Sequence, residues 1–273
     1  MMMETTIHTG NYFRKSLFFI IFIEFSLFIF SGVSFQGLYQ VPYFNFGIDP
    51  IYWLFFLLQI PQFVFTYHKV GIILDILIIL LLTYSVFIKE NKFVTWSLFI
   101  LLTMYYVSLT ATLGHRNYQT GFFILTIPFL FSSPTNRKYA FEGIRYFYIF
   151  FYFSSGIFKI INYGIFEPSM MTTTLKQQFI PYFLESNLSW RTTLNLLLIK
   201  HWVASYILFC TTVALESFFV IGFFTKKWDH VLGILLIFFH FSNWIIMDIS
   251  PIGQFSIIFY FLISNKFSSK VNG

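Results

Sequence analysis

The sequence predicts an all-α fold, a polytopic integral membrane bundle of about eight transmembrane helices with one short additional helix. Of the 273 residues, 57% are hydrophobic and only 10% are charged, and the mean hydropathy is +0.73. A soluble domain carries about 25% charged residues, so this chain has too few charges to cover a surface that faces water. Eight spans of about 20 residues with short loops account for the whole length. A soluble enzyme, a disordered chain and a nucleic-acid-binding module are therefore excluded.

The expected spans are windows of about 19 apolar residues bounded by charge, proline or glycine. In chain order they cover residues 17–35, 51–67, 70–88, 93–113, 144–161, 203–224, 231–247 and 252–263. We expect a single membrane domain over 1–273, in which 17–94 hold the N-terminal spans. The long connection 162–201 is amphipathic, and we expect it to lie at the membrane interface.

The apolar stretch Gly121–Phe131 contains Pro128 and, at about 11 residues, is too short to span alone. If it is re-entrant or lies in the membrane plane, eight spans place 11 Lys and Arg residues on the side of the N-terminus and 5 on the other. If it spans, the counts become 7 and 9. The positive-inside rule favours the first arrangement, with both termini in the cytoplasm and the chain in the inner (cytoplasmic) membrane. Topology and anionic head groups also explain the net charge of +6 without a nucleic-acid partner.

Lys159 is the strongest candidate among the ionisable residues inside spans, which are costly there and therefore candidates for function. Ser155, Tyr152 and Tyr148 precede it by four, seven and eleven residues and share its helix face. A lysine near a helix end can extend to the interface. A lysine that is removed from water in an apolar pocket gives up its proton more readily and can act as a base. The residues alone leave both interpretations open.

Two later spans carry further candidates. His240 and Asn243 share one helix face, and Glu216 lies inside the preceding span. Glu216 could pair with Lys159 or hold the imidazole of His240 in one tautomer, and the sequence leaves both possibilities open.

Three other ionisable residues lie nearer the N-terminus. Glu24 and Asp75 lie inside spans, and we interpret them as polar groups that a neighbouring helix satisfies. His115 lies at the end of a span. Nothing in the spacing of the histidines and carboxylates specifies a metal ion, so no metal site is predicted.

Four segments, in order along the chain, resemble one family. They correspond to a histidine-centred loop, a lysine segment, an acidic span and a second histidine motif. The segments are 114–123 (GHRNYQTGFF), 156–160 (GIFKI), 214–224 (ALESFFVIGFF) and 239–243 (FHFSN). Together they resemble the horizontally transmembrane (HTTM) superfamily, which includes the vitamin K-dependent gamma-carboxylases. The resemblance covers about residues 95–264, which would form the HTTM-like core.

The resemblance implies a role for each candidate. In the carboxylases, the lysine at this position is the base that starts oxygenation of the reduced quinone; a glutamyl γ-proton is then removed and CO2 adds. Carried over, Lys159 is the candidate base, and His115 is the candidate that stabilises the developing oxyanion. The remaining candidates would belong to the substrate or quinone pocket or its surroundings: Glu216, His240, Asn243, Tyr152 and Ser155.

The resemblance also implies the cofactor and partners. The cofactor would be a reduced quinone such as menaquinone or a vitamin K-like compound. Besides the lipid bilayer, the partners would be a small secreted peptide or a membrane or periplasmic protein, because short bacterial members include one needed to mature a secreted peptide toxin. The family's large extramembrane substrate-binding domain has no counterpart in these residues.

The expected function is therefore an HTTM-like membrane enzyme or maturation factor that acts on a secreted peptide or a quinone-linked, lipid-soluble substrate. The alternative is a non-enzymatic accessory, immunity or export subunit whose buried polar residues are structural.

Overall fold

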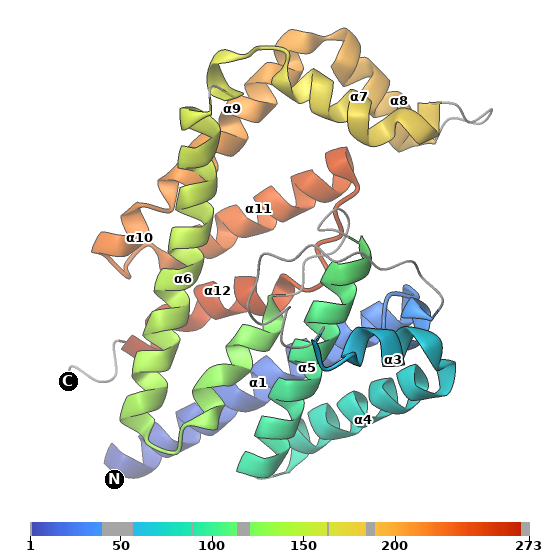
Figure 1. Cartoon of the computed structure of the whole chain (residues 1–273). Helices are drawn as coiled ribbons and strands as arrows, with labels where there is room; N and C mark the ends of the chain where they lie inside the picture. Colours follow the sequence, from blue (N-terminus) through green and yellow to red (C-terminus); the bar gives the residue numbers. More distant parts are fainter. Residues whose placement is uncertain are drawn as a thin grey trace. The chain divides into compact units, whose positions relative to one another are not determined.

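The computed structural model describes residues 2–39, 57–88, 90–113, 121–162, 164–183 and 189–268. It confirms the all-α class, because these ranges are built of helices and contain no β-strand. The chain divides into two compact units (Figure 1). Unit 1 comprises residues 1–142, 251–260 and 270–273, and unit 2 comprises residues 143–250 and 261–269.

Six helical segments in the described part of the chain are long and apolar enough to cross a membrane. They are Tyr12–Leu38, His68–Phe87, Lys92–Ala111, Thr135–Ile161, Trp202–Phe224 and Asp229–Met247. A hydrocarbon core about 30 Å thick needs about 20 helical residues. Six of the expected eight spans therefore have helices of sufficient length.

The other two expected spans have shorter helices. Residues 51–56 lie outside the described residues, and helix α3 (Ile60–Thr66) that follows them has 7 residues. Helix α12 (Phe255–Ser268) has 14 residues, which corresponds to a length of about 21 Å.

Unit 1 is organised around an antiparallel pair, α1 (Met2–Phe30) and α4 (His68–Phe87). Near the start of α1, Arg14 donates a hydrogen bond of 2.8 Å to the carbonyl oxygen of Ser85, close to the end of α4. Beyond the other end of α1, Asp75 of α4 accepts hydrogen bonds from the backbone N–H groups of Phe35 and Gln36. The segment between α1 and α4 therefore starts and ends at the same end of this pair.

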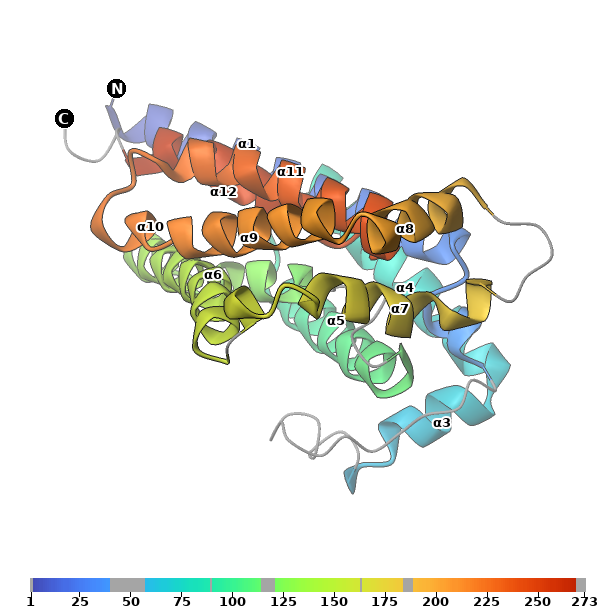
Figure 2. The ribbon, with the colours of Figure 1, turned by 90° about the horizontal axis from the view of Figure 1, so that it is seen from above.

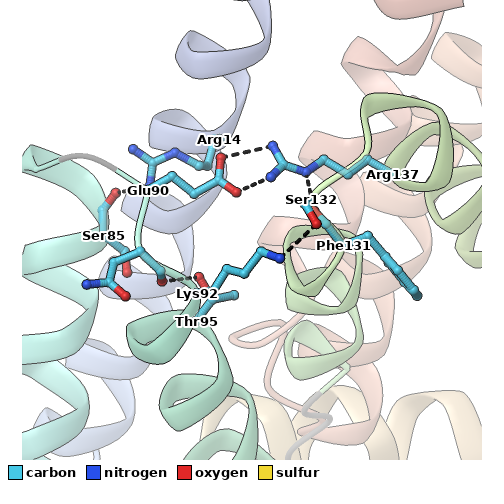
Figure 3. Close-up of polar contacts among 9 residues, drawn as sticks. Arg14, Ser85, Glu90, Lys92, Thr95, Phe131, Ser132 and Arg137 are labelled. Carbon is cyan, nitrogen blue, oxygen red and sulfur yellow. Dashed lines mark hydrogen bonds and ion pairs between the residues drawn. The ribbon is translucent and has the colours of Figure 1, made fainter.

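This pairing corrects part of the expected topology. The eight-span arrangement places residues 89–92 on the side opposite the N-terminus. In the structure, the α4–α5 turn lies beside Arg14 and also beside the start of α6 (Pro134–Ile161), where Arg137 pairs with Glu90 (Figure 3). Lys92, at the start of α5 (Lys92–Leu113), donates to the Ser132 hydroxyl at 2.7 Å. The start of α1, the α4–α5 turn and the start of α6 thus share one end of unit 1.

The short apolar stretch forms a nine-residue 3-10 helix, η2 (Phe122–Leu130), packed against α5. The rings of Phe123 and Tyr106 lie 4.7 Å apart, and Ser132 lies beside Lys92, so η2 runs antiparallel along α5. Leu113 and Ser132 are consequently at opposite ends of α5. The expected short additional helix is therefore present, and its re-entrant or in-plane placement stays a prediction. With a rise of about 2 Å per residue, η2 covers only about 18 Å.

Unit 2 contains residues 143–161 of α6, then η3 (Gly164–Phe166), α7 (Met170–Phe183), α8 (Trp190–Lys200), α9 (Trp202–Phe218), α10 (Ile221–Phe224) and α11 (Asp229–Met247), and residues 261–268 of α12. Helix α9 runs antiparallel to α6, and α11 runs parallel to it. Helices α7 and α8 form a hairpin that joins the end of α6 to the start of α9, and they lie side by side (Figures 1 and 2).

Candidate functional site

The candidate site lies where α6 and α9 cross at very short distance. A Cβ added to Gly156 would lie 2.9 Å from the backbone nitrogen of Ser217 and 3.1 Å from the Cβ of Glu216. A Cβ atom essentially never comes within 3.0 Å of an atom of a neighbouring helix, so only glycine allows the two helices to approach this closely. The crossing places the side chains of Ser155 and Lys159 directly against Glu216.

An ion pair forms at this crossing. The Nζ atom of Lys159 lies 2.6 Å from Oε1 and 2.5 Å from Oε2 of Glu216. Ser155, one turn before Lys159, donates to Oε1 at 3.2 Å and accepts from Nζ at 3.4 Å. The Glu216 side chain is only 4% exposed, whereas that of Lys159 is 31% exposed. The pair therefore joins a buried carboxylate to a lysine whose side chain is partly exposed.

The geometry decides what the sequence left open about Glu216. Its carboxylate pairs with Lys159, while the Nε2 atom of His240 lies 2.8 Å from the Tyr152 hydroxyl. Both members of this second pair are buried, and the rings of Phe219 and Phe239 lie 4.8 and 5.9 Å from the ring of Tyr152. Tyr152, and not Glu216, is thus the hydrogen-bond partner of His240.

The predicted polar stripe on α6 is present. Tyr148 and Tyr152 are buried, Ser155 and Lys159 are half-buried, and the last three bond to α9 or α11. Asn243 is not brought into this group, because its side chain makes no hydrogen bond to the described residues and its carbonyl closes the end of α11. His115 lies outside the described residues.

A second ion pair in unit 2 was missed by the sequence analysis. Arg145 binds Asp229 through Nε–Oδ2 at 2.7 Å and NH2–Oδ1 at 2.6 Å, and both side chains are buried. The same guanidinium donates to the carbonyl oxygens of Gly222 and Thr225. The sequence spacing could have indicated Arg145, because it lies fourteen residues before Lys159 and extends the same polar stripe of the helix.

Glu24 and Asp75 lie in unit 1 and hold backbone N–H groups. Asp75 binds the amides that start η1 (Phe35–Leu38), at 3.1 and 3.0 Å. Glu24 accepts from the amide of Ser256 in the first turn of α12, at 2.9 Å. The first N–H groups of a helix have no partner within the helix, so each carboxylate satisfies donors that would otherwise be buried unpaired. Both contacts agree with the structural interpretation of these residues.

Two properties define what the unit 2 arrangement can do chemically. The described residues contain no group of three or more His, Cys, Asp or Glu side chains that could hold a metal ion. They do contain an amine and a carboxylate at hydrogen-bond distance, and such a pair can exchange a proton.

The fold and site together define a helical protein with six helices, among the described residues, that are long and apolar enough to cross a membrane. It carries two ion pairs within such helices or at their ends. Comparisons with protein-family models, with curated proteins and with solved structures found no match to the chain. The resemblance to the HTTM superfamily therefore stays a prediction.

Proposed function

We propose that the protein is an HTTM-like multi-pass membrane enzyme or maturation factor in which Lys159 and Glu216 form a proton-transfer site. Its substrate would be a secreted peptide or a lipid-soluble, quinone-linked compound. The observation that carries this proposal is the asymmetry of the pair, in which the Glu216 side chain is buried and the Lys159 side chain is partly accessible. A purely structural tie does not need this accessibility.

The pair supplies a base by internal proton transfer. When one proton moves from Nζ of Lys159 to an oxygen of Glu216, the amine becomes neutral and the carboxylate becomes a carboxylic acid. The free lone pair on Nζ can then accept a proton from a substrate. Ser155 forms hydrogen bonds with both Nζ of Lys159 and Oε1 of Glu216, and so keeps the two groups at hydrogen-bond distance.

The residues around the pair fit a reduced quinone. Phe158 and Ile161, on either side of Lys159, expose apolar side chains that suit its ring and tail. The hydroxyl of Ser217 is buried and has no hydrogen-bond partner among the described residues. Lys159 would hold the hydroxyl group that is deprotonated, and the apolar side chains would exclude water. When bound, a reduced quinone supplies an acidic hydroxyl and the electrons for oxygenation.

The charge distribution of unit 1 supports an orientation. At the end that Arg14 shares with the α4–α5 turn lie five described basic residues: Arg14, Lys15, Lys92, Arg137 and Lys138. Only Lys69 lies at the opposite end of the described part of this unit. We assign the basic end to the cytoplasm and the chain to the cytoplasmic membrane.

The proposal is tested in membranes that contain the full chain, supplied with reduced menaquinone and labelled bicarbonate. Lys159→Ala should lower quinone turnover or label incorporation by about 10²–10⁴-fold, which is the usual contribution of a general base. Lys176→Ala, an exposed lysine of α7, is the matched control and should leave the activity unchanged. Equal activity of the Lys159→Ala protein and the wild type would exclude the base role.

One observation favours a second candidate function, that of a non-enzymatic accessory, immunity or export subunit. All three hydrogens of the Lys159 ammonium have an acceptor, namely the two Glu216 oxygens and Ser155, as in a structural tie between helices. The Lys159→Met and His240→Leu variants separate the two functions. Variants that accumulate normally but lose activity favour an enzyme, whereas variants that are degraded favour a structural tie.

A further inference from the structure

The hairpin of α7 and α8 is too short to cross a membrane but joins two helices that are long enough. Helix α7 has 14 residues and α8 has 11, or about 21 and 16 Å. Figure 1 shows the hairpin extending sideways from the adjoining ends of α6 and α9. Helix α8 ends at Lys200 and α9 begins at Trp202, so the change of direction occurs at His201.

The inner side of the hairpin is fixed to the rest of unit 2. Leu175, Phe179 and Leu198 form a buried cluster, to which α9 and α11 contribute Leu208 and Ile246. Two polar contacts fasten the hairpin to the end of α11. These contacts are Arg191 to Asp248 at 2.7 Å and the amide of Gln178 to the carbonyl oxygen of Met247 at 2.5 Å. The outer faces of α7 and α8 are therefore held in defined directions.

The two outer faces differ in chemistry. Helix α8 exposes the apolar side chains of Trp190 (62%), Leu196 (39%) and Leu197 (54%) beside the polar Thr193 and Lys200. The next exposed apolar side chains along the chain belong to the start of α9. Helix α7, where its side chains are described, exposes Thr173, Lys176 and Gln177 beyond its first residue. An exposed tryptophan and leucine on one helix and polar groups on the other are typical of an element that lies between lipid and water.

The α8 face also has the aromatic and basic pairing of an interfacial anchor. The guanidinium of Arg191 lies 5.1 Å from the ring centre of Trp190 and 5.8 Å from that of Trp244. Lys200 is exposed at the end of the same helix. Tryptophan rings with nearby cations are favoured at the depth of lipid head groups.

We infer that the α7–α8 hairpin lies in the lipid–water interface, with the face of α8 that carries Trp190 and Leu197 inserted into the bilayer and the face of α7 that carries Thr173 and Gln177 in water. The partner of the α8 face is the glycerol and upper acyl region of phospholipids. This inference goes beyond the expected interfacial connection, because it assigns a direction to each helix. It is independent of the proposed enzyme activity.

Site-directed spin labelling tests the inference on the full chain. Cys210 is the only cysteine, so a Cys210→Ser background accepts single labels at Leu197→Cys or Gln177→Cys. The protein is reconstituted into phosphatidylcholine–phosphatidylglycerol vesicles, and the label's collisions with oxygen and with a water-soluble nickel chelate are measured. Oxygen concentrates in lipid, so the label at 197 should favour oxygen and the label at 177 should favour the chelate.

A second pair of positions guards against a local effect of one substitution. Labels at Trp190→Cys and Thr173→Cys should repeat the contrast, and a label at Phe238→Cys, on the exposed side of α11, serves as the lipid reference. The inference is overturned if the α8 labels are as accessible to the chelate as the α7 labels. It is also overturned if all four labels match the lipid reference.

Discussion

Gly156 of α6 and Ser217 of α9 approach so closely that a Cβ on Gly156 would lie 2.9 Å from the Ser217 backbone nitrogen and 2.7 Å from its Oγ atom. One turn further along α6, Lys159 reaches the carboxylate that immediately precedes Ser217 in the chain. The separation of the two helix backbones therefore sets the geometry of the ion pair.

Replacing Gly156 by Ala should destabilise the protein by about 1–3 kcal/mol, because the added methyl group forces the two backbones apart. Gly143→Ala is the matched control on the same helix. A Cβ at Gly143 meets nothing within 4 Å, so this variant should gain about 1 kcal/mol from its better helix propensity. Thermal unfolding in detergent measures both. A stabilising effect at both positions would contradict the close crossing.

Breaking the buried ion pair of Arg145 and Asp229 should lower the free energy of unfolding much more than breaking an exposed ion pair. Asp229→Asn leaves a buried guanidinium without its counter-charge, which costs about 3–5 kcal/mol. Glu90→Gln removes the partner of Arg137, where both side chains are at least a quarter exposed, and should cost about 1 kcal/mol or less. The difference in thermal midpoint between the two variants is the measurement. Equal midpoints would mean that Arg145 is not buried against Asp229.

Tyr152→Phe should leave His240 without its hydrogen-bond partner in an apolar surrounding. An unpaired buried polar group costs about 1–3 kcal/mol, so the thermal midpoint should fall. Tyr146→Phe is the control, because Tyr146 lies on the exposed side of the same helix. If the two variants have the same thermal midpoint, the hydrogen bond between Tyr152 and His240 does not stabilise the protein.

The corrected arrangement of unit 1 predicts which positions share a side of the membrane. In the Cys210→Ser background, single cysteines at Tyr12, Asn91 and Asn136 should all react with an impermeant maleimide from the same side. A cysteine at Tyr67, at the start of α4, should react from the other side. All four positions are exposed.

The eight-span arrangement predicts a different labelling pattern. It places Tyr12, Tyr67 and Asn136 together and Asn91 alone. Labelling of intact and inverted vesicles therefore distinguishes the two, and reaction of Asn91→Cys from the side opposite Tyr12→Cys would contradict the pairing of α1 with α4.

Hydropathy was sufficient to locate the long helices but not to pair them. The expected spans 70–88 and 93–113 match α4 and α5 to within two residues. The segment 51–67 is also apolar, yet its described part holds only a short helix. The contacts of α1 with α4 place both ends of their connection at one end of the pair. Hydropathy measures transfer into lipid and contains no information on which helices are neighbours.

The candidate site was predictable along one helix and not across helices. A period of 3.6 residues places Tyr152, Ser155 and Lys159 on one face without knowledge of the fold. The partner of Lys159 depends on the close approach at Gly156, which only the packed structure shows. Arg145 lies at the start of the expected span 144–161 and was not among the candidates, although its spacing matched the stripe.

The central claim is that Lys159 acts as a base and not only as a tie to Glu216, and Lys159→Arg tests it most directly. Arginine keeps the positive charge and can pair with the carboxylate, but it does not lose its proton in proteins. We predict that this variant accumulates in the membrane like the wild type while quinone turnover with reduced menaquinone falls by about 10²-fold or more. Normal accumulation together with wild-type turnover would contradict the claim and leave the pair a structural one.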